Sequence, residues 1–261
     1  MPPSPMRNRA ATCAVAALLV IAAPLASAHA ILFAPSTESV SPGDQNIEIN
    51  IQYTHPMTGG PVIHLERPLA FGVIVDGERT DLLDTLEAGE IDGNQVFRAE
   101  YTVGQPGAHI FYMEADPYYA NYTDRYHFHY AKTLVDSMGA WSGWDEMAGF
   151  PLEIEPLVRP YGLWTGNVFQ GIVRADGEPA PGVEIEVEYL NEDGVEPPTD
   201  AHYAQVLRTD ANGVFTYAMP RAGWWGFTAT VDGEDTVEGP DGEEYGTQRH
   251  AILWVKARDM Q

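Results

Sequence analysis

The chain has 261 residues and is strongly acidic: 38 Asp and Glu stand against 14 Lys and Arg, a formal net charge of −24. This charge argues against nucleic acid or an anionic lipid surface as a partner. The length suits two modest domains.

The first 28 residues have the pattern of a secretory signal peptide. Arg7 and Arg9 give a positive start, and residues 10–23 form an apolar stretch too short to span a membrane. Residues 26–28 (Ala-Ser-Ala) form a small-residue cleavage site. We therefore expect residues 1–28 to be removed and the mature protein to be periplasmic, with no segment inserted in the membrane.

Cleavage after Ala28 would make His29 the first mature residue, and its α-amine and imidazole could then chelate one metal ion. The only cysteine, Cys13, would leave with the signal peptide. The mature chain then has no disulfide and no thiolate, so a metal site must use imidazole, carboxylate, amide, thioether or the free amine.

Alternating apolar and polar residues predict β-strands through the first half of the chain. Isoleucines alternate with polar residues over 47–51, and a similar pattern over 71–75 ends at the hairpin turn Asp76-Gly77. Residues 80–90 fit a short helix or an acidic loop. We expect residues 29–158 to form an N-terminal β-sandwich that is the candidate metal-binding domain.

The second half also consists of short predicted strands separated by Gly/Pro turns. The strand at 183–189 places its apolar residues on one face, and we expect Glu184, Glu186 and Glu188 to face water. Two sequence signatures, Gly177-x-Pro179-x-Pro181-Gly182 and the turn at 209–215, resemble the carboxypeptidase regulatory-like, transthyretin-like module. This resemblance implies a second β-sandwich over residues 159–261. The expected fold is thus mainly β, with two β-sandwich domains in tandem.

The stretch Tyr126-His127-Phe128-His129-Tyr130 is the most informative about chemistry. Alternate side chains of a strand point to opposite faces, so His127 and His129 share one face and can reach the same metal ion. The alternative is a strand that packs its aromatic residues inward and leaves both histidines in water. Both interpretations fit the pattern alone.

A further candidate ligand is His55, which follows a predicted strand and precedes Pro56. Proline restricts the backbone before it, so the imidazole would have a defined direction. Taken alone, His55 also fits a structural role. His202 and His250 fall in the second domain and receive no assigned role.

The sequence favours binding over catalysis. It has no G-x-S-x-G nucleophile motif, no H-E-x-x-H zinc-protease motif and no Gly-rich phosphate loop. We therefore expect no enzymatic activity.

Several motifs together resemble a family of proteins of unknown function described as periplasmic components of cobalt and nickel uptake systems of the energy-coupling-factor type. The motifs are Ala28-His29-Ala30, His55-Pro56-Met57, Tyr130-Ala131-Lys132-Thr133, Arg159-Pro160-Tyr161-Gly162-Leu163 and Met219-Pro220-Arg221-Ala222-Gly223-Trp224-Trp225-Gly226. The resemblance implies Ni²⁺ or Co²⁺ as bound cargo and a membrane metal transporter as a partner. His29, His55 and His129 fall on expected histidine positions of that family, and His127 is added from strand geometry.

Imidazole and amine nitrogens also suit Cu²⁺ and Zn²⁺, so the ligand types do not select nickel. Three alternatives therefore remain open. One is a periplasmic copper-binding protein with an N-terminal histidine site, another is a β-sandwich adhesion or scaffold protein without metal, and the third is an oxidative enzyme that binds copper through His29 and a second histidine.

Overall fold

The computed structural model describes residues 30–260. Within this range the chain is built from strands, and its helical content is two three-residue 3-10 turns, η1 (Leu83–Thr85) and η2 (Asp200–His202). No helix among these residues is long and apolar enough to cross a membrane. The predicted signal peptide and His29 lie outside the described residues.

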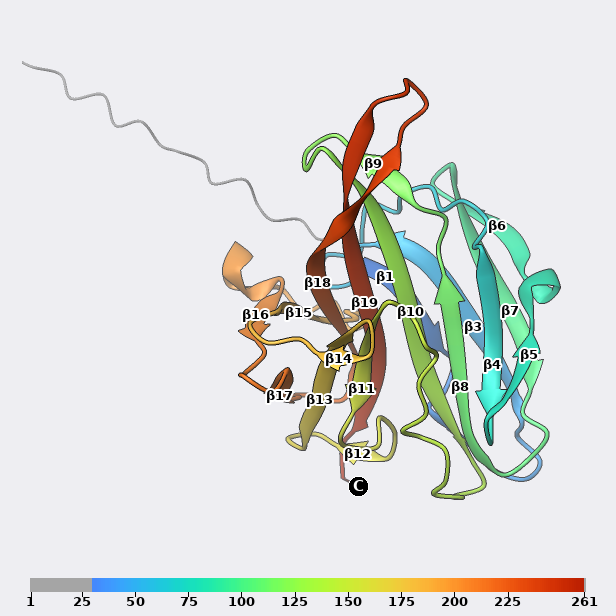
Figure 1. Cartoon of the computed structure of the whole chain (residues 1–261). Coiled ribbons are helices and arrows are strands. Elements are labelled where there is room, and N and C mark those ends of the chain that lie inside the picture. The colour runs from blue at the N-terminus through green and yellow to red at the C-terminus, as the bar shows by residue number, and fades with distance from the viewer. Residues whose placement is uncertain (1–29, 261) are drawn as a thin grey trace, which may run out of the picture.

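The strands of residues 30–260 form a large central sheet with a smaller sheet on each face (Figure 1). The main path of the central sheet has the order β16 (Gln205–Arg208), β15 (Glu184–Tyr189), β18 (Gly223–Glu238), β19 (Glu244–Arg258), β10 (Arg125–Ser137), β8 (Gly107–Glu114), β4 (Ala70–Val75) and β5 (Glu78–Asp81). Three short strands join this sheet: β12 (Leu163–Trp164) pairs with β19, while β2 (Ser39–Val40) and β9 (Tyr118–Ala120) pair with β10.

Two smaller sheets cover the faces of the central sheet. The first outer sheet has the order β1 (Ala30–Pro35), β3 (Asn46–Thr54), β7 (Asn94–Thr102) and β6 (Glu87–Ile91). The second outer sheet contains β11 (Leu152–Pro156), β13 (Val168–Ala175), β14 (Glu178–Pro179) and β17 (Val214–Ala218).

Because side chains alternate along a strand, the central sheet contributes residues to two hydrophobic cores, one on each face. Along β10, Ala131 and Val135 pack in the core under the first outer sheet, whereas Tyr130 and Leu134 pack in the core under the second. Because each face of the central sheet packs against another sheet, the middle of β10 is buried without interruption from His129 to Val135. The mainly β class and the sandwich architecture are therefore confirmed.

The parallel pairing of β10 with β19 joins the two halves of the chain. The register runs from Arg125 opposite Gly246 to Thr133 opposite Trp254. β11 likewise pairs with β13 across the predicted domain boundary at residue 159. The two sandwiches therefore share their central sheet, an arrangement that the sequence patterns did not predict.

Two local expectations have clear outcomes. Residues 80–90 contain the single 3-10 turn η1 between two short strands rather than a helix. Glu188 is only 8 % exposed, which contradicts the expectation that it faces water. Burial and the neighbouring Glu186 raise the pKa of Glu188 to about 8.

A buried ion pair ties the central sheet to the second outer sheet. Lys132 on β10 lies 2.7 Å from Glu153 on β11, and both side chains are 3 % exposed. Glu153 also accepts hydrogen bonds from the backbone N–H groups of Ala148, Gly149 and Phe150. Burial lowers the pKa of Lys132, and the Glu153 carboxylate opposes this shift.

Replacing Glu153 with alanine is expected to lower the free energy of unfolding by about 3–5 kcal/mol, because it leaves a buried ammonium without its partner. Glu87→Ala is the matched control, since its pair with Arg98 is more than half exposed, and it should cost no more than about 1 kcal/mol. Urea unfolding of both variants measures the difference. Equal costs would show that Glu153 does not stabilise the layer contact.

Candidate metal centre

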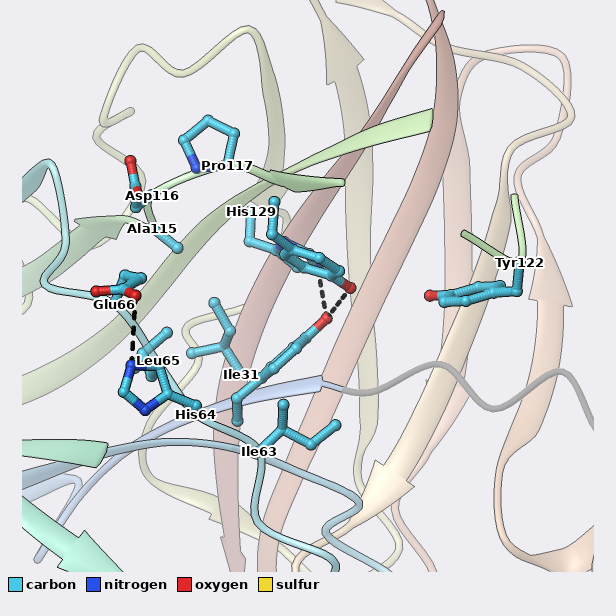
Figure 2. A pocket seen from close by; sticks show the side chains of 12 residues that line it. Ile31, Ile63, His64, Leu65, Glu66, Ala115, Asp116, Pro117, Tyr122 and His129 are labelled. Atoms are coloured by element: carbon cyan, nitrogen blue, oxygen red, sulfur yellow. Dashed lines mark hydrogen bonds and ion pairs between the residues drawn. The ribbon is translucent and has the colours of Figure 1, made fainter. Parts of the chain in front are cut away.

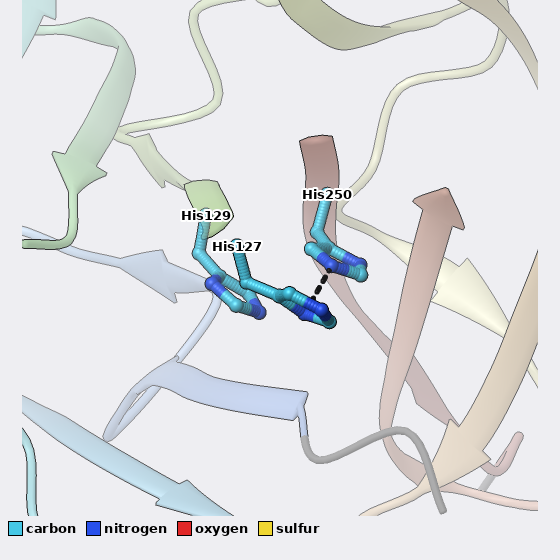
Figure 3. Close-up of side chains that lie close together, drawn as sticks. All are labelled: His127, His129 and His250. Atoms are coloured by element: carbon cyan, nitrogen blue, oxygen red, sulfur yellow. Dashed lines mark hydrogen bonds between the residues drawn. The ribbon is translucent and has the colours of Figure 1, made fainter. Parts of the chain in front are cut away.

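Three buried histidines meet between the central sheet and the first outer sheet. Residues on neighbouring parallel strands with the same register point to the same face, and His129 on β10 is the register partner of His250 on β19. His127 lies two residues before His129 and shares that face. Figure 3 shows the three rings side by side.

The ring geometry is compact. The His129 and His250 rings stack with centroids 4.4 Å apart, and the His127 ring lies 4.9 Å from that of His250. One nitrogen from each ring can be chosen so that all three lie within 4.8 Å of one another. Donor nitrogens about 2.0–2.1 Å from a tetrahedral ion lie roughly 3.3 Å apart, so small side-chain rotations would bring the three nitrogens around one ion.

Hydrogen bonds orient these rings, and His129 Nε2 lies 3.4 Å from the hydroxyl of Tyr53. His127 Nδ1 lies 3.0 Å from His250 Nε2. The outer nitrogen of each ring meets a threonine: His127 Nε2 is 2.7 Å from Thr123 Oγ1, and His250 Nδ1 is 3.0 Å from Thr230 Oγ1. The two inner nitrogens therefore face each other, while both outer nitrogens have hydroxyl partners.

This arrangement suits metal binding, in which each ligand histidine donates its other N–H to a fixed acceptor. When Thr123 Oγ1 donates to the carbonyl of Ala120, 3.2 Å away, it accepts from His127 Nε2–H. In that state the proton between the rings belongs to His250 Nε2. Metal binding would move this proton to His250 Nδ1, where Thr230 can accept it.

Burial keeps His127 and His250 in the form that binds metals. His127, His129 and His250 are 2 %, 3 % and 7 % exposed. Burial, reinforced by His127, lowers the pKa of His250 to about 3. Burial also lowers the pKa of His127, helped by Arg125 and opposed by Asp232. Both rings are therefore neutral at pH 7, as a metal ligand must be.

Two tyrosines pack against the histidine rings. Tyr118 stacks on His129 with centroids 5.7 Å apart and lies 5.3 Å from His127. Tyr53, from the first outer sheet, lies edge-on to His129, and its hydroxyl hydrogen-bonds that of Tyr118. Burial raises the pKa of both tyrosines, so they are neutral phenols and not phenolate ligands near pH 7.

The structure thus brings together two of the four predicted ligands, His127 and His129. His55 follows β3 and is not in the histidine group found among residues 30–260. His29 lies outside the described residues. Metal binding by these residues stays a prediction.

Sequence reasoning missed His250. Its contribution depends on parallel pairing between strands more than 100 residues apart, which no local pattern encodes. The only local signal is that His250 directly precedes the predicted strand at 251–255.

Comparison with known proteins identifies a family. The model of a family described as a domain of unknown function (DUF4198) matches residues 26–233, so the chain belongs to that family. No curated protein matches the sequence.

Similarities to solved structures are distant. Fibronectin(III)-like modules of Clostridium thermocellum CbhA share 8 % identity at a TM-score of 0.20, with 85 % of this chain and 90 % of that chain covered. Titin domains A168–A170 share 8 % identity at a TM-score of 0.21, with 85 % and 62 % covered. The D00–D0 domain of intimin shares 10 % identity at a TM-score of 0.22, with 85 % and 97 % covered.

The low pKa of His250 predicts how the stability of metal-free protein depends on pH. Below about pH 6.5 the unfolded chain binds a proton at His250, whereas folded His250 stays neutral until about pH 3. The contribution of neutral His250 to the free energy of unfolding is therefore lost as the pH falls through that window. At pH 5.5 the loss from His250 is about 1.4 kcal/mol. Urea unfolding at pH 7.0 and 5.5 should show a smaller loss in His250→Gln than in the wild type.

His202→Gln provides the control for this comparison, because His202 is an exposed residue. It should retain the wild-type pH dependence. An unchanged pH dependence in His250→Gln would contradict a neutral, buried His250.

Proposed function

We propose that this chain is an exported, non-catalytic protein that binds one divalent transition-metal ion through His127, His129 and His250. The observation that carries the proposal is the convergence of three buried imidazoles from two strands, each with a nitrogen close to the others. The pattern of residues 1–28 supports export to the periplasm.

The donor set restricts the class of ion. Neutral imidazoles suit Ni²⁺, Co²⁺, Cu²⁺ and Zn²⁺, whereas Mg²⁺ and Ca²⁺ prefer oxygen ligands. No carboxylate belongs to the histidine group found among residues 30–260. The site is therefore a nitrogen site for a first-row transition metal.

The resemblance to components of cobalt and nickel uptake systems makes Ni²⁺ or Co²⁺ the proposed cargo and a membrane metal transporter the proposed partner. Copper is the close rival, because affinity at nitrogen sites generally rises from cobalt through nickel to copper. Competition between metals at equal free concentration, followed by metal analysis, separates these assignments.

A β-sandwich scaffold without metal is the second candidate function. The hydrogen-bond chain from Thr123 through His127 and His250 to Thr230 favours it, because this chain satisfies the buried nitrogens without an ion. Under this alternative the histidines contribute to stability alone.

Metal titration separates the two candidates. Untagged protein should bind one equivalent of Ni²⁺ or Co²⁺ at pH 7.5. The affinity should fall less by pH 5.5 than that of free imidazoles, which take up protons near pH 6.5, because burial lowers the pKa of His127 and His250. Isothermal titration calorimetry of His129→Ala and His250→Ala should show loss of this binding. His202→Ala, altered on the surface of the other sandwich, should bind as the wild type does. Stoichiometric binding that survives both buried substitutions would refute the site.

The threonine hydroxyls give a subtler test of the same site. Thr123→Val and Thr230→Val keep the side-chain shape but remove the acceptors of the outer ring nitrogens. Each should weaken metal binding by roughly 10–100-fold, as loss of such an orienting partner does in other sites. Thr216→Val, on β17 of the second outer sheet, serves as the control. Affinities equal to the wild type in both site variants would argue that the threonines do not orient the ligands.

A further inference from the structure

A cavity of about 330 Å³ adjoins the histidine group. It lies between the end of β3, the segment 63–66 that follows it and the segment 115–118 that leads into β9. Among the residues that line the cavity, Figure 2 shows Pro117 at the top of the view, His129 near its centre, and Ile31, Leu65 and Ile63 below His129. The volume lies at the lower end of the range of small-molecule sites.

The cavity and the metal site share a wall. His129 lines the cavity and also belongs to the histidine group. Tyr118, which stacks on His129, lines it as well, together with Tyr53. A molecule at this end of the cavity therefore touches a metal ligand.

The residues that line the cavity indicate which type of molecule could bind there. Most of the wall is apolar, with Ile31, Ile63, Leu65, Ala115 and Pro117 contributing. This composition favours an organic body over a hydrated ion.

Two exposed carboxylates stand among the lining residues, those of Glu66 and Asp116. His64 lies 3.4 Å from the Glu66 carboxylate. Negative charge at this position disfavours anionic molecules and admits neutral or cationic ones.

We propose that the cavity binds a compact neutral or cationic organic molecule with an apolar body and one nitrogen donor, and that this donor completes the coordination of the metal beside His129. The inference rests on the proposed metal-binding function. Three imidazoles leave at least one position of a four-coordinate ion for a further ligand. The metal would then be carried as a mixed complex of protein and small molecule.

The probe for this site is 4-phenylimidazole, which has an apolar ring and one nitrogen donor. Added to Co²⁺-loaded protein, it should shift the visible absorption of the cobalt in a saturable manner. Phenylacetate, with a similar apolar ring but a negative charge, should bind at least about tenfold more weakly.

Leu65→Trp, which fills the cavity, should weaken the response to 4-phenylimidazole by at least about tenfold while leaving Co²⁺ affinity within about twofold. Leu69→Trp is the matched control, because Leu69 is 53 % exposed and does not line the cavity. It should respond as the wild type does. If Leu65→Trp does not fold, Ile63→Phe makes a smaller intrusion into the same space, and a crystal structure of the wild type with the probe locates the ligand directly.

The outcomes separate this inference from the proposed function. Stoichiometric Co²⁺ without a spectral shift, equal shifts in Leu65→Trp and the wild type, or a probe bound elsewhere would overturn the co-ligand role alone. Failure to bind Co²⁺ at all would overturn both.

Discussion

The parallel pairing of β10 with β19 is the constraint on which the rest of the structure depends. It joins the two halves of the chain into one central sheet and gives each face of that sheet its own core. The same register places His250 directly beside His129. A shift of one residue would turn His250 to the opposite face, because strand side chains alternate. Fold and candidate site thus share one determinant.

Burying three imidazoles costs free energy unless their nitrogens find partners. The threonines at the two ends of the hydrogen-bond chain, Thr123 and Thr230, supply partners for the outer nitrogens. On the third ring, His129 Nε2 lies 3.4 Å from the Tyr53 hydroxyl. The inner nitrogens of His127 and His250 face each other at 3.0 Å with one proton between them. A metal ion can replace that proton because the ring that loses it has a threonine acceptor on its other nitrogen. Under the proposed function, binding would require this proton shift and side-chain rotations that bring one nitrogen of each ring around the ion.

Local pattern predicted much of this molecule. Alternation correctly placed His127 and His129 on one face of a strand, with Tyr130 on the other. What it could not supply was long-range pairing, and so His250 was missed. Glu188 was misplaced for a related reason: its alternation with apolar neighbours predicts an exposed face, but burial on that face increases from the exposed Glu184 to the buried Glu188. Sequence periodicity describes one strand at a time, whereas a site between sheets depends on several.

The central claim is that His127, His129 and His250 together hold one metal ion. The most direct test is a crystal structure of protein soaked with Ni²⁺, with diffraction data collected on both sides of the nickel absorption edge. A single anomalous peak is expected at about 2.0–2.2 Å from one nitrogen of each of the three rings. A peak that lies elsewhere, or a loaded crystal in which the His127–His250 hydrogen bond persists unchanged, would contradict it.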